Sequence, residues 1–179
     1  MDLPMHGYHP MMVHLPLIAL IGAVVLDGTQ RLQPGGPWRR MASVLWIGGL
    51  LGAALAVGTG LWAFGRVDHS GASHALMTSH RNGALLALGL FVVAVIWRTL
   101  RPAAWGAVLT GAIAAALLVL AADRGATLVY RHATGIPSDI LQGVLVERGV
   151  APAVADSGSV ADTLLGTPHT HADGTVERH

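Results

Sequence analysis

The 179-residue chain contains no cysteine and no lysine. The absence of cysteine excludes disulfides, iron–sulfur ligation, a thiol nucleophile and the covalent haem attachment of a CxxCH motif. Charge is also scarce, because charged residues make up 12% of the chain while apolar residues make up 53%. The eleven basic residues, all arginines, nearly balance ten acidic residues, so no basic patch is available for nucleic acid. These proportions indicate a membrane protein whose chemistry depends on its ten histidines.

Four long windows of the sequence carry no charged residue. They hold 24, 25, 16 and 21 residues and lie between Asp2 and Asp27, Arg40 and Arg66, Arg81 and Arg98, and Arg101 and Asp123. A helix needs about 20 apolar residues to cross the hydrocarbon core of a bilayer. The windows predict an all-α fold, an integral membrane four-helix bundle with helices near 10–28, 42–64, 80–98 and 103–127. This membrane domain covers 1–136 and leaves no room before residue 130 for a separate soluble domain.

The chain changes character after this bundle. Helical spacing of apolar residues over 137–149 predicts a short external amphipathic helix, with Ile140, Leu141, Val144 and Leu145 on one face. Residues 150–179 are rich in alanine, serine, glycine and threonine, which predicts a largely disordered, flexible tail.

The arginines predict the orientation of the spans. The first connection carries Arg31, Arg39 and Arg40, and the third carries Arg98 and Arg101. Connections rich in arginine stay in the cytoplasm, so both chain ends are expected outside. Asp27 and Asp123 fall at predicted helix ends, where solvation at the membrane interface explains a carboxylate.

Six histidines lie at the predicted outer ends of the spans. His9 and His14 open the first span, His69 and His74 lie in the second connection, His80 opens the third span, and His132 follows the fourth. Counting 1.5 Å per residue from the cytoplasmic ends predicts a deeper pair, His14 and His80, and a shallower pair, His9 and His132. His69 and His74 are reserve candidates for ligands at the same end. His9 and His14 differ by about 140° of helix rotation, so both reach one site only if Pro10 ends the helix.

Two imidazoles from different helices, on either side of a flat cofactor, make a haem b site without any cysteine. His9, His14, His80 and His132 are therefore candidate axial ligands for one or two haems b. Candidate partners for the haem propionates are the neighbouring residues Arg81, Arg131 and Tyr130. Snorkelling to the membrane interface explains the two arginines equally well.

Small residues repeat at every fourth position of the second predicted helix, at Gly48, Gly52, Ala56 and Gly60. Such a row is typical of close helix–helix packing, and it also offers a smooth wall for a porphyrin.

Two other functions remain open. The segment from Met5 to Met12 contains both methionine thioethers and histidine imidazoles, and the tail carries His169, His171 and His179. Methionine and histidine side chains are residue types that bind copper, zinc or iron. A metal-ion binding or handling protein is therefore one alternative, and a cofactor-free accessory or assembly subunit is the other. The chain has no GxSxG, GxxxxGK[ST] or GxGxxG signature, which favours an electron-transfer or accessory subunit over an enzyme.

Several short sequence motifs resemble those of a bacterial four-span membrane protein family, domain of unknown function 2231. The resemblance covers about residues 8–136 and rests on His9-Pro10, His14-Leu15-Pro16, Thr59-Gly60, His80, and the run from Leu128 to His132. The following Ala133-Thr134-Gly135-Ile136 departs from the more usual Gly-Val-Gly-Val. Position by position, the family pattern selects His9, His14, His80 and His132.

The resemblance implies a place in a bacterial inner membrane. Some members are joined to Rieske-type iron–sulfur domains, which implies a redox setting. The expected partners are the lipid bilayer, other membrane redox subunits or an external electron carrier, and a quinone.

Overall fold

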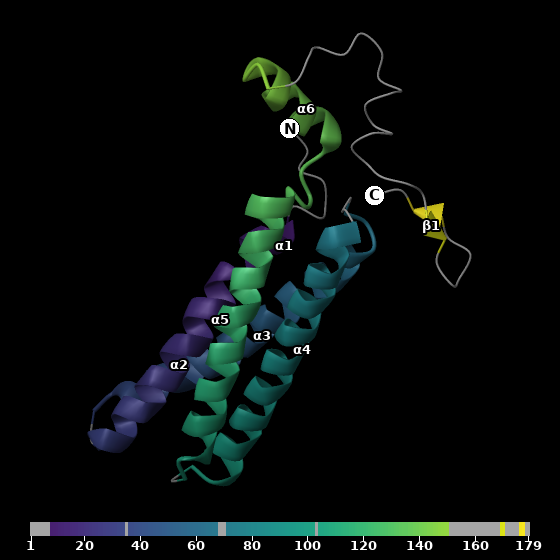
Figure 1. Ribbon diagram of the computed structural model, residues 1–179. Helices are drawn as coiled ribbons and strands as arrows, with labels where there is room; N and C mark the ends of the chain where they lie inside the picture. The colour runs from purple at the N-terminus through teal and green to yellow at the C-terminus, as the bar shows by residue number, and fades with distance from the viewer. Residues whose placement is uncertain are drawn as a thin grey trace.

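The computed structural model describes residues 8–34, 36–67, 71–102 and 104–150, and two short strands. The helices are α1 (Tyr8–Met12), α2 (His14–Leu32), α3 (Trp38–Phe64), α4 (Gly71–Leu100), α5 (Gly106–His132) and α6 (Ser138–Glu147). The strands β1 (His169–Thr170) and β2 (Val176–Glu177) pair antiparallel. Four segments of the described chain are long and apolar enough to span a membrane, with α1 and α2 forming the first (Figure 1). The predicted all-α membrane bundle is confirmed.

The helices extend beyond the segments that hydropathy marked. The third helix was expected to begin near residue 80, but α4 begins at Gly71, so His74 and His80 both lie within it. Ser73, in this added part, is fully buried. Polar side chains such as Ser73 and His74 lower the local hydropathy, but the helix continues through them. The fourth helix likewise continues to His132, which is its last residue.

The first span is broken near its start. α1 ends at Met12 because Pro16, four residues later, has no N–H to donate to the Met12 carbonyl. Pro10 lies in the first turn of α1, where backbone N–H groups have no partner within the helix. The break between α1 and α2 allows α1, and His9 with it, to take a direction different from that of α2. This break therefore comes from Pro16 and not from Pro10.

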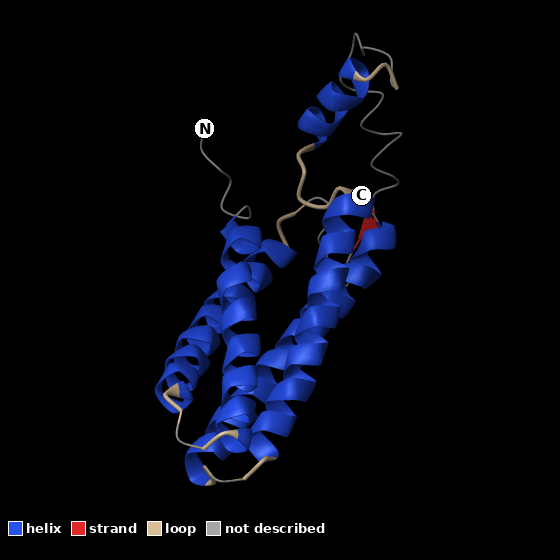
Figure 2. Cartoon of the chain, turned by 90° about the vertical axis from the view of Figure 1, so that its left-hand side faces the viewer, coloured by secondary structure: helices blue, strands red, loops and turns tan. Residues whose placement is uncertain are grey.

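The four spans form two helical hairpins, α2 with α3 and α4 with α5. The connections α2–α3 and α4–α5 lie at the same end of the bundle, and the α3–α4 connection and α6 lie at the other (Figure 2). We call the first the arginine end, after Arg31, Arg39 and Arg98, and the second the histidine end, after His9 and His80. A short helix, α6, lies within the predicted range 137–149 at the histidine end, and none of its residues is buried.

The two hairpins bury equivalent positions. In the first helix of each hairpin, buried residues match at a spacing of 71 residues, in the pairs Leu20 and Phe91, and Ala23 and Ala94. In the second helix of each hairpin the spacing is 65 residues, in the pairs Ala42 and Ala107, and Ala56 and Ala121. The bundle is thus built from two similar hairpins, of which the second has six fewer residues between the matched positions of its two helices, although the turns 33–37 and 101–105 are equally long.

Small residues allow the helices of the core to approach closely. Trp46 is buried and its ring lies edge-on to that of Phe91, with 6.0 Å between ring centres. A Cβ atom at Gly111 would lie 2.7 Å from the Trp46 ring, so only glycine fits there. Larger aliphatic side chains such as Leu15 and Leu51 are exposed on the bundle surface, where the surrounding bilayer covers them.

Candidate functional site

Two histidine rings meet between the hairpins. His9 from α1 and His80 from α4 have ring centres 6.2 Å apart, and their planes are inclined by 78°. These residues are also 71 positions apart, the spacing that relates the first helices of the two hairpins. The pair therefore joins equivalent positions of the two hairpins at the histidine end.

Both rings are held in the same way. Nδ1 of His9 lies 2.9 Å from the Ala56 carbonyl oxygen, and Nδ1 of His80 lies 2.8 Å from the Ala121 carbonyl oxygen. A carbonyl oxygen only accepts, so each Nδ1 carries the proton and donates it. In the neutral imidazole the lone pair is then on Nε2, which is the nitrogen free to bind a metal. Thr59 Oγ1 is a second neighbour of the His9 Nδ1, at 3.4 Å.

Glycine makes room for each ring. A Cβ atom at Gly60 would lie 2.8 Å from His9 Cε1, and one at Gly125 would lie 3.0 Å from His80 Cε1. Each glycine follows its carbonyl residue by four positions, one helical turn later. Each imidazole thus lies against a side-chain-free stretch of the second helix of its own hairpin.

The row of small residues in α3 serves more than one purpose. A Cβ atom at Gly52 would lie 3.2 Å from Pro16 of α2, which is helix–helix packing, whereas Gly60 accommodates His9. A Cβ atom at Gly48 would meet nothing within 4 Å. The row is therefore divided between helix packing at its centre and the histidine site at its end.

A cavity of about 500 Å³ lies beside the two rings. Most of its lining is aliphatic and comes from all four spans, and its polar side chains include His9, His14, His80 and Arg81. The Arg81 guanidinium lies over the Phe64 ring, 4.6 Å from the ring centre. The site is an apolar chamber with two oriented imidazoles and one guanidinium.

The other predicted site residues are placed differently. His14 is largely exposed but lines the cavity, and His80 meets the ring of His9 rather than that of His14. His132 is exposed and does not line the cavity. Tyr130, 88% exposed, and the exposed Arg131 also lie outside the lining, so Arg81 is the one propionate candidate that reaches it.

Of the two reserve histidines, the structure describes His74, which lies against a different ring. His74 lies in α4 with its ring 6.1 Å from that of Phe64, and His69 lies outside the described residues. The region from Met5 to Gly7 and the tail residues His171 and His179 also lie outside them. Within the described chain, no group of three or more histidine, aspartate or glutamate residues is arranged to hold a metal ion.

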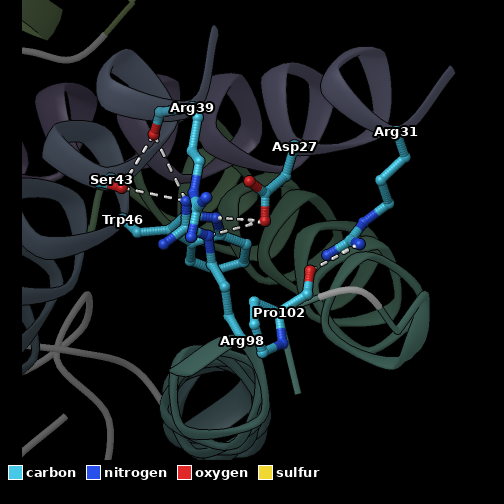
Figure 3. A network of polar contacts seen from close by, with 7 residues as sticks. All are labelled: Asp27, Arg31, Arg39, Ser43, Trp46, Arg98 and Pro102. Atoms are coloured by element: carbon cyan, nitrogen blue, oxygen red, sulfur yellow. Dashed lines mark hydrogen bonds and ion pairs between the residues drawn. The ribbon is translucent and has the colours of Figure 1, made fainter. Parts of the chain in front are cut away.

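A second polar cluster, which the sequence interpretation missed, lies at the arginine end (Figure 3). Asp27 was expected to be solvated, but it is only 4% exposed. Its Oδ2 accepts from Arg98 Nε at 2.8 Å and from Trp46 Nε1 at 3.3 Å. Arg98 also donates from Nη2 to Ser43 Oγ at 3.0 Å. The interpretation of Asp27 as a solvated helix end is wrong, because Trp46 of α3 and Arg98 of α4 bind its carboxylate and the side chain is buried.

A sequence signal for this cluster exists. Asp27 and Arg98 are 71 residues apart, as are His9 and His80. The same spacing therefore places an imidazole pair at one end of the bundle and an ion pair at the other.

A family model matches most of the chain. The family model described as a predicted membrane protein (DUF2231) matches residues 5–138. No curated protein and no solved structure matches the chain.

Proposed function

The chain belongs to the DUF2231 family of predicted membrane proteins, and we propose that it is a membrane electron-transfer subunit that binds haem b between His9 and His80. The observation that carries this proposal is the histidine pair itself. The two imidazoles come from different hairpins, each is fixed through Nδ1, and each keeps Nε2 for a metal.

The separation of the rings fits two ligands on one metal. A metal–imidazole bond is about 2 Å long, so two histidines could hold one bound metal only if their rings lie close together. The ring centres of His9 and His80 are 6.2 Å apart. The hydrogen bonds from Nδ1 to the carbonyls of Ala56 and Ala121 fix the tautomer and the orientation of the two rings.

The chamber also fits a flat apolar cofactor. Its volume of about 500 Å³ lies in the range of about 300–1,000 Å³ that is typical of cofactor sites. Its aliphatic lining would contact the apolar faces of a bound macrocycle, and Arg81 is a candidate to bind a propionate carboxylate by charge-assisted hydrogen bonds. When bound, the haem would supply one-electron redox chemistry. The donor and acceptor we propose are a quinone or another membrane redox subunit, and an external electron carrier.

An absorption spectrum of the detergent-purified protein tests the proposal. We expect a Soret band and, after reduction, the α band of a low-spin haem with two axial histidines. His9→Ala and His80→Ala are each expected to abolish the low-spin spectrum, because each removes one ligand. His132→Ala is the matched control and is expected to keep it, because His132 is exposed and lies outside the cavity.

The same experiment separates the alternatives. A protein that stays colourless after incubation with haem contradicts the proposal. Stoichiometric copper or zinc without porphyrin would indicate a metal-ion protein, and neither ligand would indicate an accessory subunit. If haem binds, its reduction by a quinol in the wild-type protein tests the electron-transfer step separately from binding.

A further inference from the structure

A second, smaller pocket lies at the arginine end, at the opposite end of the bundle from the histidine pair. It has a volume of about 70 Å³ and is lined by Asp27, Gln30, Arg31, Arg39, Arg98 and Pro102. These residues come from the end of α2, the start of α3, and the end of α4 with the turn that follows it. The pocket therefore lies where the two hairpins and their turns meet.

The charges around this pocket do not balance. Three guanidinium groups line it, and Asp27 is its one carboxylate. Asp27 is already paired with Arg98. Two positive charges, those of Arg31 and Arg39, are left without a carboxylate in the lining.

The guanidinium groups of Arg31 and Arg39 also carry N–H donors that have no hydrogen-bond partner among the residues that the structure describes. Arg31 donates from Nη1 to the Pro102 carbonyl oxygen at 2.9 Å, while its Nε is buried and has no hydrogen-bond partner. The Arg39 side chain makes no hydrogen bond or ion pair with any residue that the structure describes, although its carbonyl accepts from Arg98 and Ser43 (Figure 3). Arg31 Nε is a buried donor, which is costly to leave without a partner, and a bound anion would satisfy it. Arg39 is exposed, so its guanidinium can also donate to an anion in the pocket.

We propose that this pocket binds a phosphate group, carried by an anionic phospholipid or free in solution. Arginine side chains present planar, forked donors that match phosphate oxygens. A volume of about 70 Å³ holds about five water-sized spheres at 10–15 Å³ each, and a phosphate has five heavy atoms. The ends of membrane helices lie at the level of lipid headgroups, where basic pockets between helices bind anionic lipids.

Lipid and phosphate titrations of the detergent-purified protein test this proposal. Native mass spectrometry counts bound phosphatidylglycerol and phosphatidylcholine, and calorimetry measures binding of inorganic phosphate. We expect the wild-type protein to retain phosphatidylglycerol in preference to phosphatidylcholine if the lipid is the source. Selective binding of inorganic phosphate would instead identify the free anion as the source.

Two neighbouring arginines provide a matched pair of variants. Arg39→Gln removes a pocket guanidinium and is expected to weaken binding of the phosphate-bearing ligand about tenfold, as expected for one charge-assisted hydrogen bond. Arg40→Gln removes the same charge from an exposed residue outside the pocket and is expected to change binding less than about twofold. Equal losses in both variants, or no binding of either ligand by the wild-type protein, would overturn the proposal. The thermal midpoint of each variant checks that it is folded.

Discussion

Asp27 and Arg98 show how a span tolerates a buried charge. Arg98 reaches Asp27 across the bundle, and its side chain is 17% exposed against 6% for Asp27. Trp46 adds a hydrogen bond to the same carboxylate oxygen. The carboxylate is thus the more deeply buried partner, and the arginine can reach solvent more easily.

This difference in burial predicts unequal effects of the two neutralising substitutions. Arg98→Gln leaves an uncompensated buried carboxylate and is expected to lower the free energy of unfolding by about 3–5 kcal/mol. Asp27→Asn leaves a guanidinium closer to solvent and is expected to cost less. Both values are measured by denaturant unfolding in mixed micelles, with the exposed Arg101→Gln as the control. A larger loss for Asp27→Asn than for Arg98→Gln would contradict this account.

Among the elements, α3 carries two glycines close together with different surroundings. Gly60 faces His9, whereas a Cβ atom at Gly58 would meet nothing within 4 Å. Both are helical, so replacement by alanine improves the intrinsic helix propensity equally, by roughly 0.5–1 kcal/mol. The two positions therefore separate crowding of the histidine from changes in the helix itself.

We expect Gly60→Ala to displace the His9 ring and Gly58→Ala to leave it in place. If haem b binds as proposed, Gly60→Ala should weaken the low-spin spectrum while Gly58→Ala keeps it. In the apoprotein, the chemical shifts of the His9 ring in NMR spectra should change only in Gly60→Ala. An unchanged ring in Gly60→Ala would show that the site adjusts to an added methyl group.

At the scale of the whole molecule, the two hairpins face each other through equivalent positions. The His9–His80 pair lies at one end and the Asp27–Arg98 pair at the other. The cavity is lined from both hairpins beside the histidine pair. A cofactor held by His9 and His80 would therefore add a link at the histidine end between two hairpins that the Asp27–Arg98 ion pair and the Trp46–Phe91 contact already join.

The membrane orientation is a prediction that the absence of native cysteine makes easy to test. Gln33 lies just after α2 at the arginine end, and Ser138 begins α6 at the histidine end. Both are exposed. In Ser138→Cys, a membrane-impermeant maleimide should label intact bacterial cells, because the histidine end is expected outside. In Gln33→Cys, labelling should require permeabilised cells, and the opposite pattern would contradict the predicted orientation.

The sequence by itself determined the fold class and the number of spans. Hydrophobicity and the absence of charge are local properties, and a bilayer requires each spanning segment to satisfy its own backbone hydrogen bonds. The same local information selected His9, His80 and Arg81 among the candidates and excluded every chemistry that needs cysteine. It did not locate the helix ends, because α4 begins with polar residues that lower the local hydropathy without ending the helix.

Only the tertiary structure decided which side chains meet. Depth counting paired His14 with His80, but the helix break caused by Pro16 turns His9 toward α3 and brings its ring to His80. Asp27 likewise pairs with Arg98, a residue 71 positions away in the sequence. Spacing along one helix gives height and rotation within that helix, whereas contacts between helices depend on how the hairpins pack. The sequence therefore determined the elements and the chemistry available, and hairpin packing determined the site.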